Sequence, residues 1–355
     1  MVSGIGAALA AVVTVAEYFL ANYGPCKITI NDDKEVTTEG GGSVLAVLTE
    51  NKIFIPSACG GRGTCALCKL KVMEGGGPLL PTEEPLLTDQ EKKDHVRLSC
   101  QVKLRSDIRI EIPQELFSIR EYEAECARIT DLTADMRLFR FELGGSESME
   151  YVPGQYVQLL TPVYAQSDEE VYRAYSVAGD PADKGAVELI IRLVPGGICT
   201  TYCFEYLKQG DKVKFNGPYG EFRLSQTDSP IVFIAGGSGM APIRCMLYQM
   251  RNEGIARRAT YYFGANKVEE LCLVDEMRRF EKELKGFRFV PVVASPEKPW
   301  DGETGLVTQA VQRGIEDGGR VEAYLCGSPG MIDASIAVLK DRGLTEDRIF
   351  YDKFA

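Results

Sequence analysis

The sequence of 355 residues contains one histidine, His95, and one tryptophan, Trp300. The scarcity of histidine argues against histidine-rich metal sites and against Ser-His-Asp catalysis, because both depend on imidazole groups. Positive charge is also in short supply: 40 Lys and Arg stand against 51 Asp and Glu, for a net charge of −11. Because binding to nucleic-acid phosphates relies on clustered Lys and Arg, this balance argues against a nucleic-acid partner. The chemistry must come from cysteine or from a cofactor.

The rest of the composition is that of a folded protein. Hydrophobic residues make up 45% and charged residues 26% of the chain, which argues against wholesale disorder, collagen and a polytopic membrane protein. At roughly 150 residues per domain, the length predicts two to three domains. In contrast to histidine, the reactive residue cysteine is frequent, with 11 copies.

Residues 4–23 form a hydrophobic run that only three polar residues interrupt. A helix of this length spans about 30 Å, the thickness of the hydrocarbon core of a bilayer. No Lys or Arg precedes the run, so it lacks the basic region of a cleaved signal peptide. A membrane anchor, a helix docked on another subunit and a buried helix all remain open, and Glu17 counts against the anchor. We predict a single-pass anchor in the inner (cytoplasmic) membrane, with cytoplasmic catalytic domains because Lys27 and Lys34 follow the run.

The remainder divides into three units by its hydrophobic pattern. Residues 24–115 combine short strands with one short helix, residues 120–226 are a run of short strands typical of a barrel, and residues 227–355 alternate strand and helix. The predicted strands are 27–30, 69–72, 98–102, 108–112, 137–143, 155–160, 187–193, 212–215, 230–235, 259–264, 287–294 and 321–326. The predicted helical segments are 43–55 (a short helix running into an apolar segment), 200–207, a helix after Pro242 through Met250, 269–284, 307–313 and 331–340.

Four cysteines have the spacing of an iron–sulfur site. Cys59, Cys65 and Cys68 stand as C-x5-C-x2-C, one residue longer than the plant-type ferredoxin pattern, and Cys100 follows after 31 intervening residues. Three glycines between the first two cysteines let the backbone wrap a compact object with its amides turned inward. Zinc is an alternative, but tetrahedral zinc sites usually pair two C-x2-C knuckles, and a disulfide would be rare in a reducing compartment. We predict these four residues as ligands of a [2Fe–2S] cluster.

Arg173, Tyr175 and Ser176 form an R-x-Y-S motif at the end of a strand pattern. A guanidinium suits a phosphate, a flat phenol suits the isoalloxazine face, and a hydroxyl suits ring N5. Downstream, Gly197 and Thr200 stand where a helix begins, a position suited to a pyrophosphate. The alternative is an ordinary strand followed by a capped helix; we predict that these residues bind FAD.

Gly236, Gly237 and Gly239 lie between a buried strand and a helix, the context of a dinucleotide site. Pro242 stands where the third glycine of a G-x-G-x-x-G fingerprint would be, and a tight strand–helix turn is the alternative. Cys326 again follows an apolar strand, so a nucleotide crossing the carboxyl ends of the strands would reach both loops. We predict that Cys326 lies near the nicotinamide, although a buried cysteine is more often a packing residue.

Together these residues resemble the family of ferredoxin-fused flavoprotein reductases and, within it, the F subunit of the sodium-translocating NADH:quinone oxidoreductases. The matching stretches are 57–61, 80–83, 173–176, 217–222, 239–242, 300–302 and 326–329. The resemblance implies a multidomain α+β and α/β fold: an N-terminal apolar helix at 1–23, a β-grasp [2Fe–2S] ferredoxin domain at 24–115, an antiparallel β-barrel FAD domain at 120–226 and a doubly wound parallel α/β NAD domain at 227–355.

The resemblance also implies roles for single residues. Arg173, Tyr175, Ser176 and Thr200 would contact FAD, and Gly237, Gly239 and Cys326 would line the route to the nicotinamide. Phe354 resembles the C-terminal aromatic residue of the family, which shields the flavin and must move for hydride transfer. We therefore predict Ser176, Cys326 and Phe354 as the catalytic residues.

The implied function is an NADH-oxidising flavin/iron–sulfur reductase. Hydride would pass from NADH to FAD, and single electrons would pass through the cluster to an acceptor protein or to membrane redox subunits of a hetero-oligomeric respiratory complex. NADH is favoured over NADPH, because Lys267 is followed by two acids, Glu269 and Glu270, where a 2′-phosphate needs positive charge. The reductase of a soluble oxygenase, a corrinoid-activating protein and an electron carrier without NADH turnover remain as alternatives.

Overall fold

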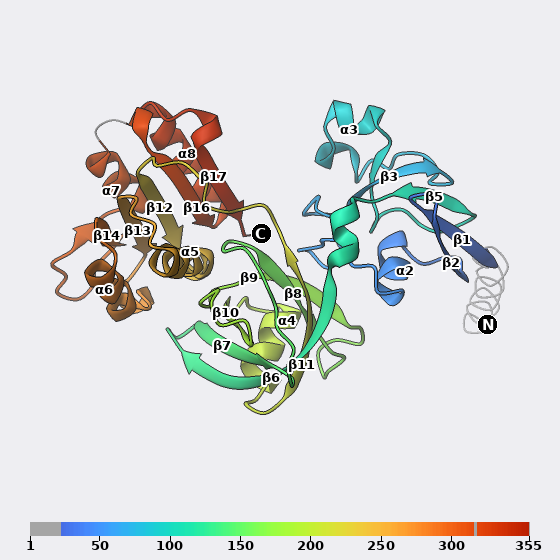
Figure 1. Ribbon diagram of the computed structural model, residues 1–355, viewed down its shortest axis with the longest axis horizontal. Coiled ribbons are helices and arrows are strands. Elements are labelled where there is room, and N and C mark those ends of the chain that lie inside the picture. The colour runs from blue at the N-terminus through green and yellow to red at the C-terminus, as the bar shows by residue number, and fades with distance from the viewer. Residues whose placement is uncertain (1–22, 316–317, 355) are drawn as a thin grey trace, which may run out of the picture. The chain divides into compact units, whose positions relative to one another are not determined.

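The computed structural model describes residues 23–315 and 318–354 (Figure 1). The described residues fall into two compact units, the first ending at Glu121 and the second beginning at Tyr122. The predicted apolar helix of residues 1–23 lies outside the described residues except for Tyr23. In the described ranges, every helix is too short or too polar to cross a membrane.

The first unit is a five-stranded mixed sheet with a helix packed on it (Figure 1). Its elements are β1 (Pro25–Ile30), β2 (Lys34–Glu39), α2 (Val44–Glu50), β3 (Lys69–Glu74), η1 (Glu84–Leu86), α3 (Asp89–Lys93), β4 (Val96–Leu98), β5 (Ile108–Glu111) and η2 (Gln114–Ser118). The strand order is β2-β1-β5-β3-β4, with β1 and β5 parallel. Val44, Val47 and Leu48 bury the inner face of α2 in the core that the strands form. This arrangement is the predicted β-grasp fold.

The first half of the second unit is an antiparallel sheet of six strands in the order β10-β7-β6-β11-β8-β9. Its elements are β6 (Arg120–Asp131), β7 (Met136–Leu143), β8 (Tyr156–Thr161), β9 (Val171–Ser176), β10 (Ala186–Arg192), α4 (Ile198–Thr201), η3 (Tyr202–Tyr206) and β11 (Lys212–Tyr219). A bridge between Val177 and Leu189 joins the end of β9 to β10, so the two edge strands meet and the sheet curls into the predicted barrel.

The second half is a parallel sheet of six strands in the order β15-β14-β13-β12-β16-β17. Its elements are β12 (Ile231–Gly236), η4 (Gly237–Gly239), α5 (Met240–Glu253), β13 (Ala259–Ala265), η5 (Val268–Glu270), α6 (Val274–Glu283), β14 (Phe287–Val293), β15 (Glu303–Thr304), α7 (Val307–Gly314), η6 (Gly318–Arg320), β16 (Glu322–Gly327), α8 (Pro329–Asp341), η7 (Glu346–Arg348) and β17 (Ile349–Lys353). Helices α5 and α6 pack in one core and α7 and α8 in another, on opposite faces of the sheet, which confirms the doubly wound fold.

Several predicted elements differ from the structure. The strand predicted at 98–102 is wrong: β4 ends at Leu98, because the amide of Gln101 donates to the Leu98 carbonyl at 2.8 Å and turns the chain. The helix predicted at 269–284 begins only at Val274, after Leu273 adopts a φ of 55°. Strand β17 was not predicted, although it carries the last described residues to the edge of the parallel sheet.

Candidate functional site

Three of the predicted cluster ligands lie in the loop between α2 and β3, and Cys100 lies in the turn after β4. The loop turns at three glycines of positive φ, which are Gly60 at 64°, Gly61 at 85° and Gly63 at 72°. An L side chain is strained at such angles, so the turn favours glycine. The turn aims backbone amides at sulfur atoms: Thr64 and Cys65 at Cys59, Leu67 at Cys65, and Gly63 at Cys100.

The four sulfur atoms lie as two pairs. The Sγ atoms of Cys68 and Cys100 are 3.3 Å apart, and Cys59 and Cys65 share the other thiol hydrogen bond. The hydrogen bond from Cys65 lowers the pKa of Cys59 to about 3, and the one from Cys68 lowers the pKa of Cys100. Within residues 23–315 and 318–354, no three His, Cys, Asp or Glu side chains gather round one point as a single metal ion requires. Two pairs of thiols suit a cluster of two irons better than one tetrahedral zinc.

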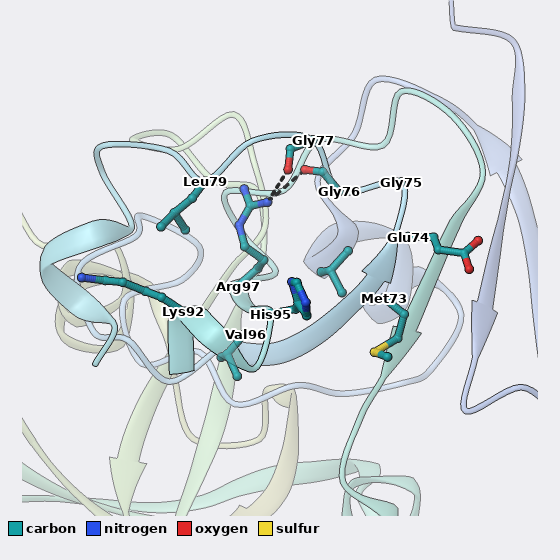
Figure 2. Close-up of a pocket in the computed structure, with 11 residues that line it drawn as sticks. Met73, Glu74, Gly75, Gly76, Gly77, Leu79, Lys92, His95, Val96 and Arg97 are labelled. Carbon is teal, nitrogen blue, oxygen red and sulfur yellow. Dashed lines mark hydrogen bonds between the residues drawn. The ribbon is translucent and has the colours of Figure 1, made fainter. Parts of the chain in front are cut away.

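A buried ion pair supports the strand that leads to Cys100. Glu83 is fully buried and accepts hydrogen bonds from Arg97 Nε at 3.0 Å and from the amide of Leu98 at 2.9 Å. The Arg97 guanidinium also donates to the three carbonyls of residues 76–78 at 3.0–3.1 Å, and Figure 2 shows the first two of these bonds. Burial acts to raise the pKa of Glu83, but the bonds from Arg97 and the amides outweigh it and lower that pKa. The pair thus fixes the glycine-rich loop and β4 to one another.

A polar cavity of about 280 Å³ adjoins this ion pair. His95 and Lys92 line it together with the loop of residues 74–77, as Figure 2 shows. His95 has a φ of 59°, because it makes the tight turn between α3 and β4. The single histidine of the chain therefore shapes a turn beside Arg97.

The three residues of the R-x-Y-S motif share one strand of the barrel. Arg173 and Tyr175 lie two positions apart on β9 and so face the same side of the sheet, opposite Leu159 and Val157 of β8. Ser176 ends the strand and is 5% exposed. Strand β9 therefore carries three of the five residues predicted to bind FAD.

Gly197 and Thr200 lie where α4 begins, but this helix has four residues before the chain passes into the π-turn η3. The Thr200 hydroxyl accepts a hydrogen bond from the Val194 amide at 3.1 Å. A side chain on Gly197 would approach that hydroxyl to 2.6 Å, so the glycine leaves room for the loop to close. The helix predicted at 200–207 is thus present as α4 followed directly by the π-helical turn η3, and together they cover residues 198–206.

The predicted nucleotide loop and Cys326 meet at the carboxyl edge of the parallel sheet. Strands β12 and β16 are neighbours, with Ala235 opposite Cys326. Gly237 has a φ of 56°, and a Cβ on Gly239 would lie 2.1 Å from the Cys326 carbonyl oxygen. The backbones of the two loops therefore come into contact at the carboxyl ends of neighbouring strands.

Arg192, at the end of β10 in the barrel, lies beside the same loop and was not predicted. A Cβ on Gly237 would be 3.1 Å from its Nη1 atom, while its Nε donates to Asp135 at 2.7 Å. The loop of residues 236–242 contains no Lys or Arg of its own. The positive charge nearest to Gly237 therefore comes from the neighbouring barrel, and the signal that could have found it is a basic residue at the end of a strand just before the Gly196-Gly197 loop.

Strand β17 brings two more groups to the loop after β16. Asp352 lies opposite Cys326, and the amide of Phe354 donates to the Gly327 carbonyl at 2.9 Å. Burial raises the pKa of Asp352 to about 6, and burial together with the charge of Asp352 raises the pKa of Cys326. Asp352 was not predicted, although the apolar run Ile349-Phe350-Tyr351 could have indicated the strand, and the role of Phe354 at the flavin remains a prediction.

Three protein families match successive parts of the chain. Residues 28–105 match the 2Fe-2S iron-sulfur cluster binding domain, residues 123–224 the oxidoreductase FAD-binding domain, and residues 233–336 the oxidoreductase NAD-binding domain. These families confirm the predicted cofactor set of an iron–sulfur cluster, FAD and NAD(H).

Curated relatives match the whole chain. The F subunit of the Na(+)-translocating NADH-quinone reductase of Marinomonas sp. is 33% identical, covering 100% of this chain and 97% of its own length. The corresponding subunit of Idiomarina loihiensis is 34% identical, covering 98% and 95%. Among solved structures, a cytochrome P450 reductase of Amycolatopsis has a TM-score of 0.74 at 27% identity, covering 93% of this chain and 98% of that one. A ferredoxin reductase of carbazole 1,9a-dioxygenase has a TM-score of 0.72 at 24% identity, with the same coverage of both chains.

Proposed function

The chain belongs to the family of F subunits of the Na(+)-translocating NADH-quinone reductases, and from this membership we propose that it oxidises NADH and delivers the electrons one at a time to a separate acceptor. The observation that carries the proposal is the pairing of the four cysteine sulfurs in a chain that also has FAD-binding and NAD-binding domains. Such a chain can accept hydride from NADH and release single electrons to an acceptor.

The chemistry that the bound groups supply is a change of electron number: FAD takes hydride from NADH, and the cluster carries one electron at a time. The chain's own residues bind and orient these groups. Arg173 would hold a phosphate of FAD, Tyr175 would pack on the ring system, and Ser176 would present its hydroxyl to ring N5. Gly237 and Gly239 would line the route to the nicotinamide, and Phe354 would cover the flavin until NADH arrives.

The surroundings of β13 support NADH rather than NADPH as the donor. Beyond this strand the Glu270 carboxylate accepts a hydrogen bond from the Asn266 amide at 2.9 Å. The nearby Lys267 is paired with Glu297 at 2.8 Å. A 2′-phosphate would therefore meet acids and a neutralised base, whereas a free ribose hydroxyl can bond to a carboxylate. A higher kcat/KM with NADPH than with NADH would contradict this assignment.

The acceptor would approach the cysteine loop of residues 60–68. This loop exposes Arg62, Thr64 and Leu67, the last with 41% of its surface accessible. The full-length relatives are subunits, so we propose that the chain is the NADH-input subunit of a hetero-oligomeric membrane complex. The anchor of residues 4–23 remains a prediction from the sequence.

The test separates the two halves of the function. Cys65→Ser should abolish the reduction of a one-electron acceptor and lower the iron content, while NADH oxidation with a two-electron dye stays near the wild-type rate. Cys272→Ser, which removes a buried thiol of the NAD-binding half, is the matched control and should retain both activities. Loss of both activities in Cys65→Ser at full FAD content would contradict the proposed division.

A second candidate is the reductase of a soluble oxygenase, which the likeness to the cytochrome P450 reductase of Amycolatopsis favours. The two candidates differ in their partners rather than in their chemistry. Purification of the full chain from native membranes distinguishes them: co-purifying redox subunits support the membrane complex, and a chain recovered alone in the soluble fraction supports the oxygenase reductase.

A further inference from the structure

One arginine of the NAD-binding domain makes bonds into the FAD-binding domain. Arg244, on α5, is 5% exposed. Its Nη1 atom donates to the Ala178 carbonyl at 2.8 Å and to Glu188 Oε2 at 2.7 Å, both in the barrel. Its Nε atom donates to Glu276 of α6 at 2.9 Å. The buried guanidinium of Arg244 thus connects α5 with three other segments of the second unit, which are the residues after β9, strand β10 and helix α6.

Two of the partners of Arg244 lie close in sequence to residues proposed to hold the cofactors. Ala178 lies two residues after Ser176, the end of the flavin motif, and Glu188 lies four residues before Arg192 on β10. Arg244 itself lies five residues after Gly239, which is about 7.5 Å along a helix. The guanidinium therefore connects the flavin-side segment to the nucleotide loop over a short and rigid path.

The chemistry of the contact requires arginine rather than any buried cation. Glu188 and Glu276 are both nearly buried, so their charges need a partner at this depth. A planar fork reaches acceptors in three directions at once, whereas the ammonium of lysine is a single point on a flexible stem. Tyr248 completes the arrangement, because its hydroxyl donates to Glu276 at 2.6 Å and accepts from Arg244 Nη2 at 3.2 Å.

We propose that Arg244 is a positioning residue that fixes the nucleotide loop relative to the flavin-binding strand and so sets the geometry of hydride transfer. This inference rests on the proposed function, because only an NADH-oxidising chain needs that geometry. Displacement of about 1 Å between reacting groups can lower a rate by about 100-fold. The guanidinium of Arg244 is buried and bonded to protein acceptors, so its replacement should change the rate of the step rather than the binding of NADH or FAD.

A second link between the same domains provides the matched control. Arg251, two turns further along α5, pairs with Asp180 at 2.6 Å, and its side chain is 36% exposed. Arg244 and Arg251 both border a cavity of about 320 Å³, but Arg251 is far more exposed than Arg244, which is 5% exposed. An ion pair at such a position contributes little, and Arg251→Lys should leave the domain arrangement intact.

The first experiment measures anaerobic bleaching of bound FAD by NADH and by 4-deuterated NADH. In Arg244→Lys the limiting rate should fall about 10- to 100-fold, the deuterium isotope effect should persist, and the apparent NADH dissociation constant and the FAD content should change by less than about threefold. Arg251→Lys should stay within about twofold of wild type. A wild-type limiting rate in Arg244→Lys, or a loss of rate that only follows a loss of FAD, would overturn the proposal.

A second experiment needs no turnover. Calorimetry of the FAD-loaded full chain should show the FAD-binding and NAD-binding domains of wild type and of Arg251→Lys unfolding in one transition, and in Arg244→Lys as two. One shared transition in all three proteins would overturn the link between the domains. Failure of wild-type FAD to bleach with NADH, despite separated transitions in Arg244→Lys, would instead overturn the proposed function and with it the catalytic role of Arg244.

Discussion

The cysteine loop of residues 59–68 and the nucleotide loop of residues 236–242 are both rich in glycine, but glycine serves a different purpose in each. Gly61 has a φ of 85°, and a Cβ there would meet no atom closer than 3.8 Å. Gly239 has an ordinary φ of −60°, and a Cβ there would lie 2.1 Å from the Cys326 carbonyl oxygen. Position 61 of the first loop thus needs glycine for its backbone angle, and position 239 of the second needs it for space.

The difference has a physical consequence. Backbone strain is local, and a residue other than glycine at a positive φ costs about 1–2 kcal/mol. A methyl group that meets a backbone carbonyl cannot be accommodated by rotating a side chain, so the turn that carries Gly239 and the strand that carries Cys326 must move apart. We therefore expect substitutions in the nucleotide loop to be the more damaging.

The largest effect should follow Gly239→Ala. The added methyl group would collide with the Cys326 carbonyl and displace β12 from β16, so NADH-driven bleaching of the flavin should fall by more than about 100-fold. The rate of bleaching and the thermal stability of the chain measure the effect. Gly330→Ala is the control, because a Cβ on this helical glycine meets no atom within 4 Å. Near-normal bleaching in Gly239→Ala would show that the strands can separate at little cost.

Arg192→Ala should have the next largest effect. It tests whether the barrel supplies the positive charge beside the nucleotide loop. Loss of a charge-assisted hydrogen bond to the diphosphate of NADH, about 1.5–3 kcal/mol, should raise the KM for NADH about 10-fold or more with little change in kcat. Arg320→Ala removes an exposed charge just before β16, at the opposite edge of the sheet, and should leave the KM unchanged. Equal shifts in the two variants would point to a general charge effect.

Gly61→Ala should have a smaller effect on the cysteine loop. The cluster should still assemble, because the methyl group has room, but the strained backbone should lower stability by about 1–2 kcal/mol and speed the loss of iron to a chelator. Absorbance of the cluster over time measures that loss. Gly77 has a similar φ, 65°, and lies in a loop without cysteines. Gly77→Ala should therefore leave the rate of iron loss unchanged. Complete failure to bind iron would mean that position 61 lacks room for a side chain, so that space rather than the backbone angle determines the need for glycine there.

The smallest effect on NADH oxidation is expected at Asp352, a carboxyl opposite Cys326 without a counterpart at the cysteines. Burial raises its pKa to about 6 from 3.8, so the folded chain holds this proton more tightly than the unfolded chain does. The resulting stability is fully present below about pH 4 and is lost as the pH rises through about 6. Asp352→Asn should therefore raise the free energy of unfolding by up to about 3 kcal/mol at pH 8 and by nothing at pH 4. Denaturant titrations at the two pH values measure this, and a gain that does not depend on pH would contradict the assignment.

The cysteine loop was predictable from the sequence because three of its four ligands and all of its turning glycines lie within ten residues. The nucleotide loop was predictable only in part. Its glycines follow a buried strand in the sequence, but Arg192 approaches it from the sheet of the barrel, and Asp352 reaches the adjoining Cys326 through the pairing of β17 with β16. Both residues lie far from the loop in the chain. The turn at Cys100 was mistaken for strand because Leu98 and Val102 are apolar and alternate, while the hydrogen bond that turns the chain belongs to the backbone.

The burial of most of the cysteines makes it possible to measure the fraction of molecules that carry the cluster. Of the 11 thiols, Cys59 and Cys65 are partly accessible, and the other nine are buried. An alkylating reagent applied to the native chain should therefore modify about two residues per molecule when iron is absent and none when it is present. Mass spectrometry of the labelled protein would then report the occupancy of each preparation, molecule by molecule, without reference to its colour.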